Sequence, residues 1–154
     1  MEYEIVTLEE KTVVGLTART NNTSPDMGAV IGGLWQKFYG DKVYDSICNK
    51  RDGKALGIYT DYAGDEKDDY TIMTGCEVSK AEEIPPEAAV KHIPAGKYAR
   101  FVVKGELHKS VGAFWQKLWQ MELDRAFTAD FEEYQNSDPE HTEIHIYISL
   151  KAEE

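Results

Sequence analysis

The residues with the clearest chemical potential lie near the C-terminus, in the run Phe131-Glu132-Glu133-Tyr134. In an extended segment alternate side chains share a face, so Glu132 and Tyr134 point the same way. A carboxylate among aromatic rings is poorly solvated, which raises its pKa or favours a cationic partner. A flat organic cation would also contact the rings, and each cation–π contact contributes roughly 0.5–2 kcal/mol. The alternative is that Glu132 is a solvated charge on an exposed edge strand.

Aromatic residues elsewhere in the chain could supply the walls of such a site. Tyr59 holds the corresponding place in the first half of the chain, so we expect it to approach Glu132 from the opposite side. A cross-strand aromatic pair is the alternative for Tyr59. Trp35 and Trp115 lie on apolar helical stripes, where packing in the core is the alternative to contact with a ligand.

Four further residues are candidates for the edges of the site. Tyr39 and Trp119 occupy matched positions beside these stripes and would form either a wall of a pocket or its partly buried rim. His145 and Tyr147 share the polar face of the last expected strand and would line the floor of a groove. For His145 a structural role is the alternative.

The sequence indicates neither metal nor phosphate chemistry. The four histidines lack the spacing of metal ligands, and Cys48 and Cys76 are far apart, which gives no zinc signature. No glycine-rich run matches a phosphate-binding loop. We therefore expect no metal and no cofactor, and we expect the cysteines to be reduced thiols.

An internal repeat indicates the elements that position these residues. Residues 31–38 read IGGLWQKF and residues 111–118 read VGAFWQKL, which is a shift of 80 residues. Fixed-shift similarity predicts a duplicated supersecondary unit. Runs rich in β-branched and aromatic residues surround both copies, at Lys11–Arg19, Ala55–Tyr62 and Tyr70–Val78 in the first half and at Lys97–Lys104, Asp130–Tyr134 and Thr142–Leu150 in the second. Both halves therefore read strand, helix, strand, strand.

Capping signals frame the first helix. Ser24 is a good N-cap, Pro25 suits the first helical position and Asp26 suits the first turn, while Gly40-Asp41 can end the helix. Between the halves, residues 80–87 contain Pro85-Pro86, which cannot continue a strand ladder, so this segment is the expected link.

These elements predict an α+β fold in a single domain, residues 1–154, with half-repeats at about 1–79 and 88–154. We expect two small antiparallel sheet units related by a pseudo-twofold axis, each with a helix on one face. In the last strand the face that should pack on the helices carries Ile144, Ile146, Ile148 and Leu150. Pairing the units leaves a groove between the halves, and such seams often hold ligands.

Composition restricts the possible partners. Asp and Glu number 28 against 17 Lys and Arg, so the formal net charge of −11 would repel nucleic acid and anionic membranes. The N-terminal run MEYEIVTLEE lacks the basic and apolar regions of a secretory signal. No stretch approaches the roughly 20 apolar residues that a membrane span needs. The sequence therefore predicts a cytoplasmic protein with no direct contact to nucleic acid or membrane.

The sequence resembles the GyrI-like, or AraC-type, effector-binding domains in three features. They are the strand-helix-strand-strand order of both halves, the helical Gly-x-x-Trp-Gln-Lys in each half and the run at residues 131–134. The resemblance covers essentially the whole chain. The late Phe-Glu-x-Tyr motif of that family corresponds to Phe131, Glu132 and Tyr134. In regulators that carry this domain, the glutamate of the motif and surrounding aromatic residues receive lipophilic cationic drugs. The resemblance therefore implies recognition of amphipathic, cationic or aromatic small molecules.

Other implications of the resemblance differ between members of the family. The regulators add a DNA-binding module, for which this chain has no residues left, so we do not expect it to control transcription alone. Some free-standing members are linked to gyrase inhibition, so a regulator or gyrase is a possible protein partner. Others hydrolyse cyclopropane-bearing alkylating natural products. In that alternative, Glu132 would be the general base and Tyr59 or Tyr134 would donate a hydrogen bond to the leaving carbonyl oxygen.

Overall fold

Strands dominate the computed structural model, which describes residues 2–21, 25, 27–64, 69–82, 84–136, 138 and 140–151. Within these residues the first half contains β1 (Glu4–Leu8), β2 (Lys11–Thr20), α1 (Met27–Gly40), α2 (Val43–Ser46), β3 (Lys50–Thr60) and β4 (Tyr70–Val78). The second half contains β5 (Ala89–Ile93), β6 (Gly96–Gly105), α3 (Leu107–Gln120), β7 (Ala129–Tyr134) and β8 (Thr142–Ser149). The predicted α+β class is confirmed.

The described strands form one continuous sheet of eight in the order β1-β6-β8-β7-β3-β4-β2-β5, and every pairing is antiparallel. The expectation of two separate sheet units is therefore wrong. The halves are joined in the middle of the sheet, where β3 pairs with β7 and Gly57 lies opposite Glu132. This junction could not be read from local sequence, because it depends on pairing between distant segments.

The order of strands has the twofold symmetry that the repeat predicted. Exchanging each element for its counterpart in the other half reverses the order and leaves it unchanged. The repeated unit also includes a leading strand that the sequence did not reveal. β1 precedes β2 along the chain but pairs with β6, and β5 precedes β6 but pairs with β2. Each half therefore contributes an edge strand to the other.

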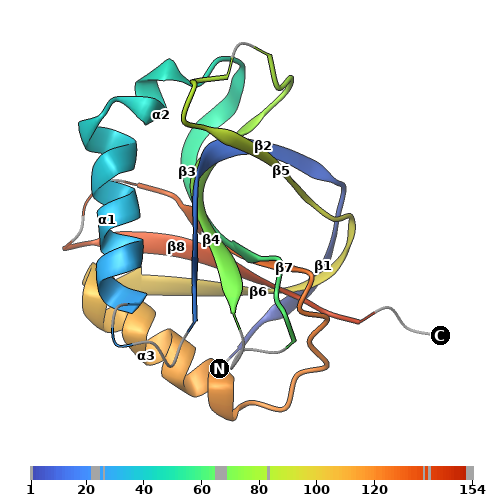
Figure 1. The fold of residues 1–154 in the computed structure, drawn as a ribbon. Helices are drawn as coiled ribbons and strands as arrows, with labels where there is room; N and C mark the ends of the chain where they lie inside the picture. Colours follow the sequence, from blue (N-terminus) through green and yellow to red (C-terminus); the bar gives the residue numbers. More distant parts are fainter. Residues whose placement is uncertain are drawn as a thin grey trace.

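The sheet is curled, and α1 and α3 lie outside the curl (Figure 1). Helix α1 packs Phe38 against a cluster from β2 and β4 that includes Val14 and Cys76. Helix α3 packs Phe114 and Leu118 against β6 and β8, with Ile144, Ile146 and Ile148 fully buried beneath it. The prediction that this face of β8 supports a helix is confirmed. A third cluster, which includes Phe131 and Tyr147, fills the inner side of the curl.

Five of the six predicted strands agree with the structure within one residue at each end, whereas β3 begins at Lys50 and ends at Thr60 rather than spanning Ala55–Tyr62. Helix α1 ends at Gly40, as predicted, and a short helix that was not predicted follows at α2. The capping residues Ser24 and Asp26 lie outside the described residues. Pro25 lies in a turn just before α1. The described residues between β4 and β5 are irregular, as expected for the link that contains Pro85-Pro86.

Candidate functional site

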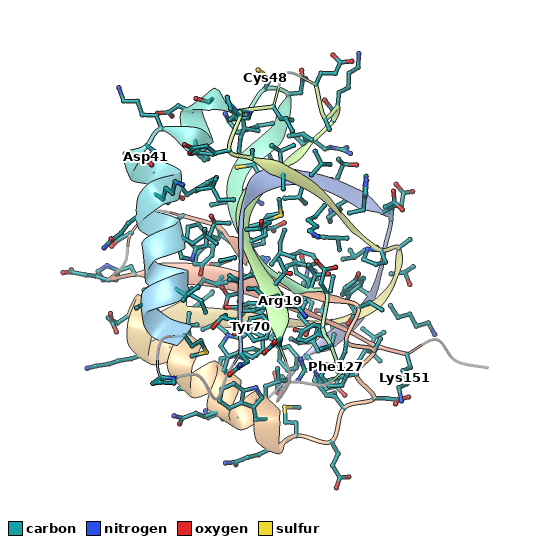
Figure 2. The ribbon with its side chains drawn as sticks, in the orientation of Figure 1. Arg19, Asp41, Cys48, Tyr70, Phe127 and Lys151 are labelled. Atoms are coloured by element: carbon teal, nitrogen blue, oxygen red, sulfur yellow. The ribbon has the colours of Figure 1, made fainter. Side chains whose placement is uncertain are left out.

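A cavity of about 1360 Å³ lies on the helix-covered side of the sheet. Helix α1 packs on β2 and β4 and helix α3 packs on β6 and β8 (Figures 1 and 2), and residues of both helices line the cavity together with Tyr59 of β3 and Glu132 of β7. Both halves line the cavity. The predicted site residues among its lining are Trp35, Tyr39, Tyr59, Trp115, Trp119, Glu132 and Tyr134.

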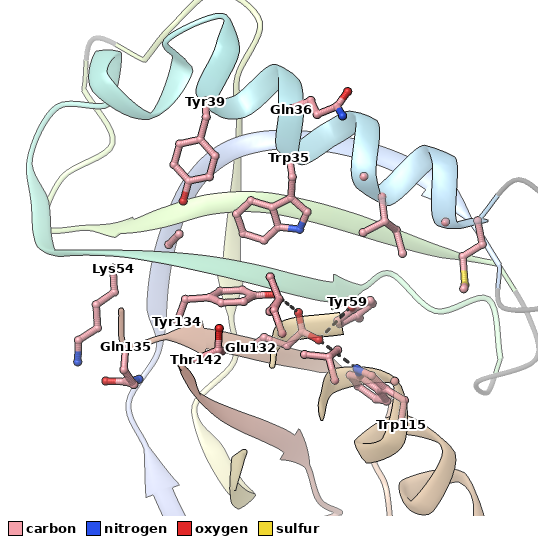
Figure 3. Close-up of a pocket in the computed structure, with 18 of the residues that line it drawn as sticks. Trp35, Gln36, Tyr39, Lys54, Tyr59, Trp115, Glu132, Tyr134, Gln135 and Thr142 are labelled. Carbon is pink, nitrogen blue, oxygen red and sulfur yellow. Dashed lines mark hydrogen bonds between the residues drawn. The ribbon is translucent and has the colours of Figure 1, made fainter. Parts of the chain in front are cut away.

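Glu132 is the buried acid of this cavity, with 2% of its surface exposed. Its Oε2 accepts hydrogen bonds from the Trp115 indole Nε1, at 3.0 Å, and from the Tyr59 hydroxyl, at 3.2 Å. Its Oε1 accepts a hydrogen bond from the Tyr134 hydroxyl at 2.9 Å (Figure 3). One carboxylate is thus held by three aromatic donors from three different elements.

Gly57 gives this carboxylate its place. It lies opposite Glu132 in the β3–β7 ladder. A Cβ atom at Gly57 would lie 2.9 Å from Glu132 Oε1 and 3.3 Å from the Trp35 ring. Any larger residue would push the acid or the indole from its position, so glycine is needed here for space.

The electrostatics of the cavity favour a cation. Burial raises the pKa of Glu132, and the hydrogen bonds from Trp115, Tyr134 and Tyr59 lower it only in part. Burial and the charge of Glu132 raise the pKa values of Tyr59 and Tyr134, so both phenols are neutral donors. Among the described residues, no basic side chain forms an ion pair with Glu132. The negative charge of Glu132 is therefore stabilised only by dipoles.

Aromatic rings enclose the carboxylate. The Trp35 ring packs edge-on against Tyr134 at 5.3 Å, and Tyr59 packs edge-on against Trp115 at 5.2 Å, both measured between centroids. Each contact joins a residue of one half to a residue of the other. Tyr39 and Trp119 are 52% and 43% exposed, so they lie at the rim rather than in the interior.

His145 and Tyr147 are not among the residues that line this cavity. Tyr147 stacks on Phe131 at 4.6 Å in the core on the inner side of the curl. His145 lies 3.0 Å from Glu143. The groove lies on the helix side of the sheet, whereas these two residues share the opposite face of β8. The prediction that they form the floor of the groove is therefore wrong.

The cavity also contains residues that sequence reasoning missed. Two tyrosines, Tyr62 and Tyr70, lie beside Tyr59, with Tyr59 and Tyr70 ring centroids 5.6 Å apart. Gln36 of α1 and Gln116 of α3 line the cavity from the two helices. A signal for the glutamines was present, because both follow the repeated tryptophan of the two halves. No comparable signal marks Tyr70, which enters the site from the neighbouring strand.

Other kinds of site are absent from the part of the chain that the structure covers. No group of three or more His, Cys, Asp or Glu residues is placed to hold a metal ion there. None of the helices described is both long and apolar enough to cross a membrane. Both cysteines are free thiols, with Cys48 exposed and Cys76 buried.

Several solved structures share this fold. The Vibrio cholerae integron cassette protein VCH_CASS2 is 26% identical, with a TM-score of 0.79 over 97% of this chain and 95% of that one. SAV2435, solved with bound tetraphenylphosphonium, is 21% identical, with a TM-score of 0.79 over 99% of this chain and 95% of that one. EcmrR in a DNA complex is 14% identical, with a TM-score of 0.64 over 97% of this chain and 58% of that one.

Sequence comparison supports the same relationship. A search of curated protein sequences gave no significant match. The sequence model of the Cass2 family, described as integron-associated effector binding protein, matches residues 4–150. The resemblance to effector-binding domains is thereby confirmed, and the chain belongs to the Cass2 family of integron-associated effector binding proteins.

Proposed function

We propose that the chain binds amphipathic, cationic or aromatic small molecules in the cavity between its two halves. The observation that carries this proposal is the buried, dipole-stabilised carboxylate of Glu132 within aromatic walls. A buried charge without a counterion is costly, and a ligand cation would offset that cost. The rings would meanwhile remove the apolar surface of the ligand from water.

The dimensions of the cavity support ligands with several rings. Pockets for drug-sized molecules are typically about 300–1,000 Å³, and this cavity of about 1360 Å³ exceeds that range. Trp35 and Trp115 belong to opposite helices, so a bulky ligand could contact both indoles. We infer that their roles in packing and in ligand contact coexist, because both rings are partly buried and both line the cavity.

Tetraphenylphosphonium, the ligand of SAV2435, is the natural probe. We expect it to bind with saturable heat in calorimetry and to quench tryptophan fluorescence. Tetraphenylborate has the same shape and the opposite charge, so it should not bind. Equal binding of the cation and the anion would refute recognition by charge, and absence of binding to a panel of lipophilic cations would refute the proposal.

Glu132→Gln tests the residue itself, and Glu133→Gln is the matched control. The two acids are adjacent on β7 and face opposite sides of the sheet, and Glu133 is bound by Gln135 instead of by the aromatic donors. Loss of tetraphenylphosphonium affinity in Glu132→Gln but not in Glu133→Gln supports the proposal. Equal affinities in both variants would contradict it.

The hydrolase alternative rests on the raised pKa of Glu132, which suits a general base. Against it, Oε2 already accepts two hydrogen bonds, so only Oε1 could receive a proton from water. Product from a cyclopropane-bearing alkylating compound in excess over protein, abolished by Glu132→Gln, would support hydrolysis. Product no greater than the amount of protein would favour the binding function.

Binding of a small molecule could be passed on through a protein partner. We propose that a separately encoded regulator or gyrase could receive the ligand-bound form. Affinity capture with the purified candidate, with and without tetraphenylphosphonium, tests this. A complex that forms only with the ligand supports an effector role, and no complex under either condition contradicts it.

A further inference from the structure

A buried ion pair, separate from Glu132, lies at the cavity. Arg125 lines the cavity and is only 9% exposed, and its Nη2 donates to Asp130 Oδ2 at 2.7 Å. Asp130 is fully buried. The two charges compensate each other, so this end of the cavity is electrically neutral, unlike the site around Glu132.

The acid of this pair has no capacity left for a ligand. Asp130 Oδ1 accepts from the Ser149 backbone N–H at 2.8 Å and from the Ser149 hydroxyl at 3.1 Å. Its Oδ2 accepts from Arg125 and from the Tyr62 hydroxyl, at 2.7 Å each. Four donors satisfy the carboxylate, so Asp130 holds Arg125 in place and does not recognise a cation.

Arg125, in contrast, has donors to spare. A guanidinium carries five N–H groups, and the only hydrogen bond of Arg125 to another described residue is the one from Nη2 to Asp130. Its Nε is buried and has no partner there. The other buried side-chain atoms without a partner in that part of the chain belong to Thr74 and Arg100, and neither residue lines the cavity.

Rings hold the guanidinium in a fixed orientation. Its central carbon lies 4.3 Å above the Phe127 ring, and Phe127 packs edge-on against Tyr62 at 5.6 Å. The ring centroid of Tyr62 in turn lies 5.8 Å from that of Tyr70. Tyr70 and Phe127 are labelled in Figure 2. A fixed planar donor with unsatisfied N–H groups, walled by rings, is suited to bind an oxygen acceptor.

The balance of charge selects the kind of acceptor. Asp130 already neutralises Arg125, and Glu132 adds a negative charge to the same cavity. A ligand anion would therefore meet net repulsion, whereas a neutral carbonyl or ether oxygen would accept the spare N–H groups without adding charge.

The spacing fits one ligand molecule. Asp130 and Glu132 are two residues apart on one face of β7, which corresponds to about 7 Å at the rise of a strand. We propose that the Arg125 end of the cavity is a second subsite for a neutral hydrogen-bond acceptor. The preferred ligands then carry a lipophilic cation near Glu132 and a carbonyl or ether oxygen on the order of 7 Å away. This inference rests on the proposed cation-binding function.

Three phosphonium probes with chains of equal length test the subsite. They are pentyltriphenylphosphonium, its 4-oxopentyl analogue and its 4-carboxybutyl analogue. We expect the ketone to bind at least about fivefold tighter than the alkyl compound, as expected when one polar partner is gained. The carboxylate should bind no tighter than the ketone. Equal binding of ketone and alkyl probes, as would occur if water fills the subsite equally well, would overturn the inference.

Two variants assign the preference to Arg125. The double variant Arg125→Met with Asp130→Asn removes both charges together, so neither is left buried alone. Arg125→Lys keeps the charge beside Asp130 but removes the fork of donors. In each variant the ratio of alkyl to ketone dissociation constants should fall towards one. A ratio that stays at its original value in Arg125→Lys would overturn the inference, even if the double variant failed to fold.

The two proposals fail in different ways. If none of the three phosphonium probes binds the unmodified protein, the cation-binding function is wrong and the subsite has no basis. If all bind with equal affinity, the cation-binding function stands and only the acceptor subsite is refuted. Tighter binding of the carboxylate than of the ketone would show that the subsite selects anions, which also overturns the inference.

Discussion

Acidification should weaken the binding of a lipophilic cation, because it protonates Glu132. Burial raises the pKa of this carboxyl above its ordinary value, so the proton is gained at a higher pH than for a solvated glutamate. Above that pKa the ionised carboxylate attracts the ligand, and below it the neutral acid does not. Because linkage is reciprocal, a bound cation lowers the pKa of Glu132 and extends binding to lower pH.

The size of the effect follows from the geometry. The donors of Tyr59, Trp115 and Tyr134 flank the carboxylate, and the positive phosphorus of tetraphenylphosphonium is enclosed by its own rings, so the two charges stay several ångströms apart. For a charge separation of about 6 Å and an effective dielectric constant near 20, Coulomb's law gives about 3 kcal/mol. That corresponds to roughly a hundredfold change in the dissociation constant between the ionised and protonated states.

Calorimetric titration of tetraphenylphosphonium between about pH 8 and pH 4.5 measures this effect, since the probe itself does not titrate. The unmodified protein and Glu133→Gln should lose affinity as the pH falls. Glu132→Gln should bind weakly at every pH, with an affinity near that of the protonated protein. A flat profile in the unmodified protein, or a sloping one in Glu132→Gln that matches it, would refute the electrostatic reasoning.

Four further predictions concern space, backbone and stability. Gly57→Ala should lower tetraphenylphosphonium affinity in calorimetry and cost about 1–3 kcal/mol in thermal unfolding, because its Cβ would crowd Glu132 and Trp35. Gly33→Ala should stabilise α1 by about 0.5–1 kcal/mol, because nothing lies within 4 Å of its Cβ. Gly15→Ala should prevent folding, seen as loss of the far-UV circular dichroism signal, because its Cβ would overlap main-chain atoms of β4. Because the folded-state pKa of Glu132 is raised, its contribution to stability should be greatest below the unfolded pKa and lost as the pH rises through the folded pKa. Chemical denaturation of Glu132→Gln should lack this pH dependence. The same change in unfolding free energy with pH in the variant and in the unmodified protein would contradict this prediction.

The internal repeat in the sequence predicted most of the helices and strands. Each copy of the Trp-Gln-Lys segment lies on a helix, and six strands occur where the composition predicted them. The leading strands β1 and β5 were missed because each has five residues and forms an edge. Their exchange between halves could not be predicted at all, since pairing partners far apart in sequence leave no local signal.

Side-chain alternation correctly placed Glu132 and Tyr134 together, but it does not say which face of a sheet meets the helices. For β8 the apolar face was correctly assigned to the helices. The cavity lies between those same helices, so the opposite face, with His145 and Tyr147, could not line it. The alternation that puts Ile144, Ile146 and Ile148 under the helix thus also puts His145 and Tyr147 outside the site.

The chemistry of the site arises where the two halves differ. At the centre of the sheet, Gly57 pairs with Glu132 and Tyr59 pairs with Asp130. Twofold symmetry exchanges these two pairs, so Tyr59 corresponds to Glu132 and Gly57 corresponds to Asp130. The symmetric scaffold supplies an indole from each helix. At the seam, however, the first half supplies Gly57, which leaves space, and the hydroxyl of Tyr59, whereas the second half supplies the acids Asp130 and Glu132. Because Arg125 neutralises only one of these acids, a single negative charge remains at the seam. A ligand with its positive charge at one end would therefore bind in one orientation, although the surrounding fold is nearly symmetric.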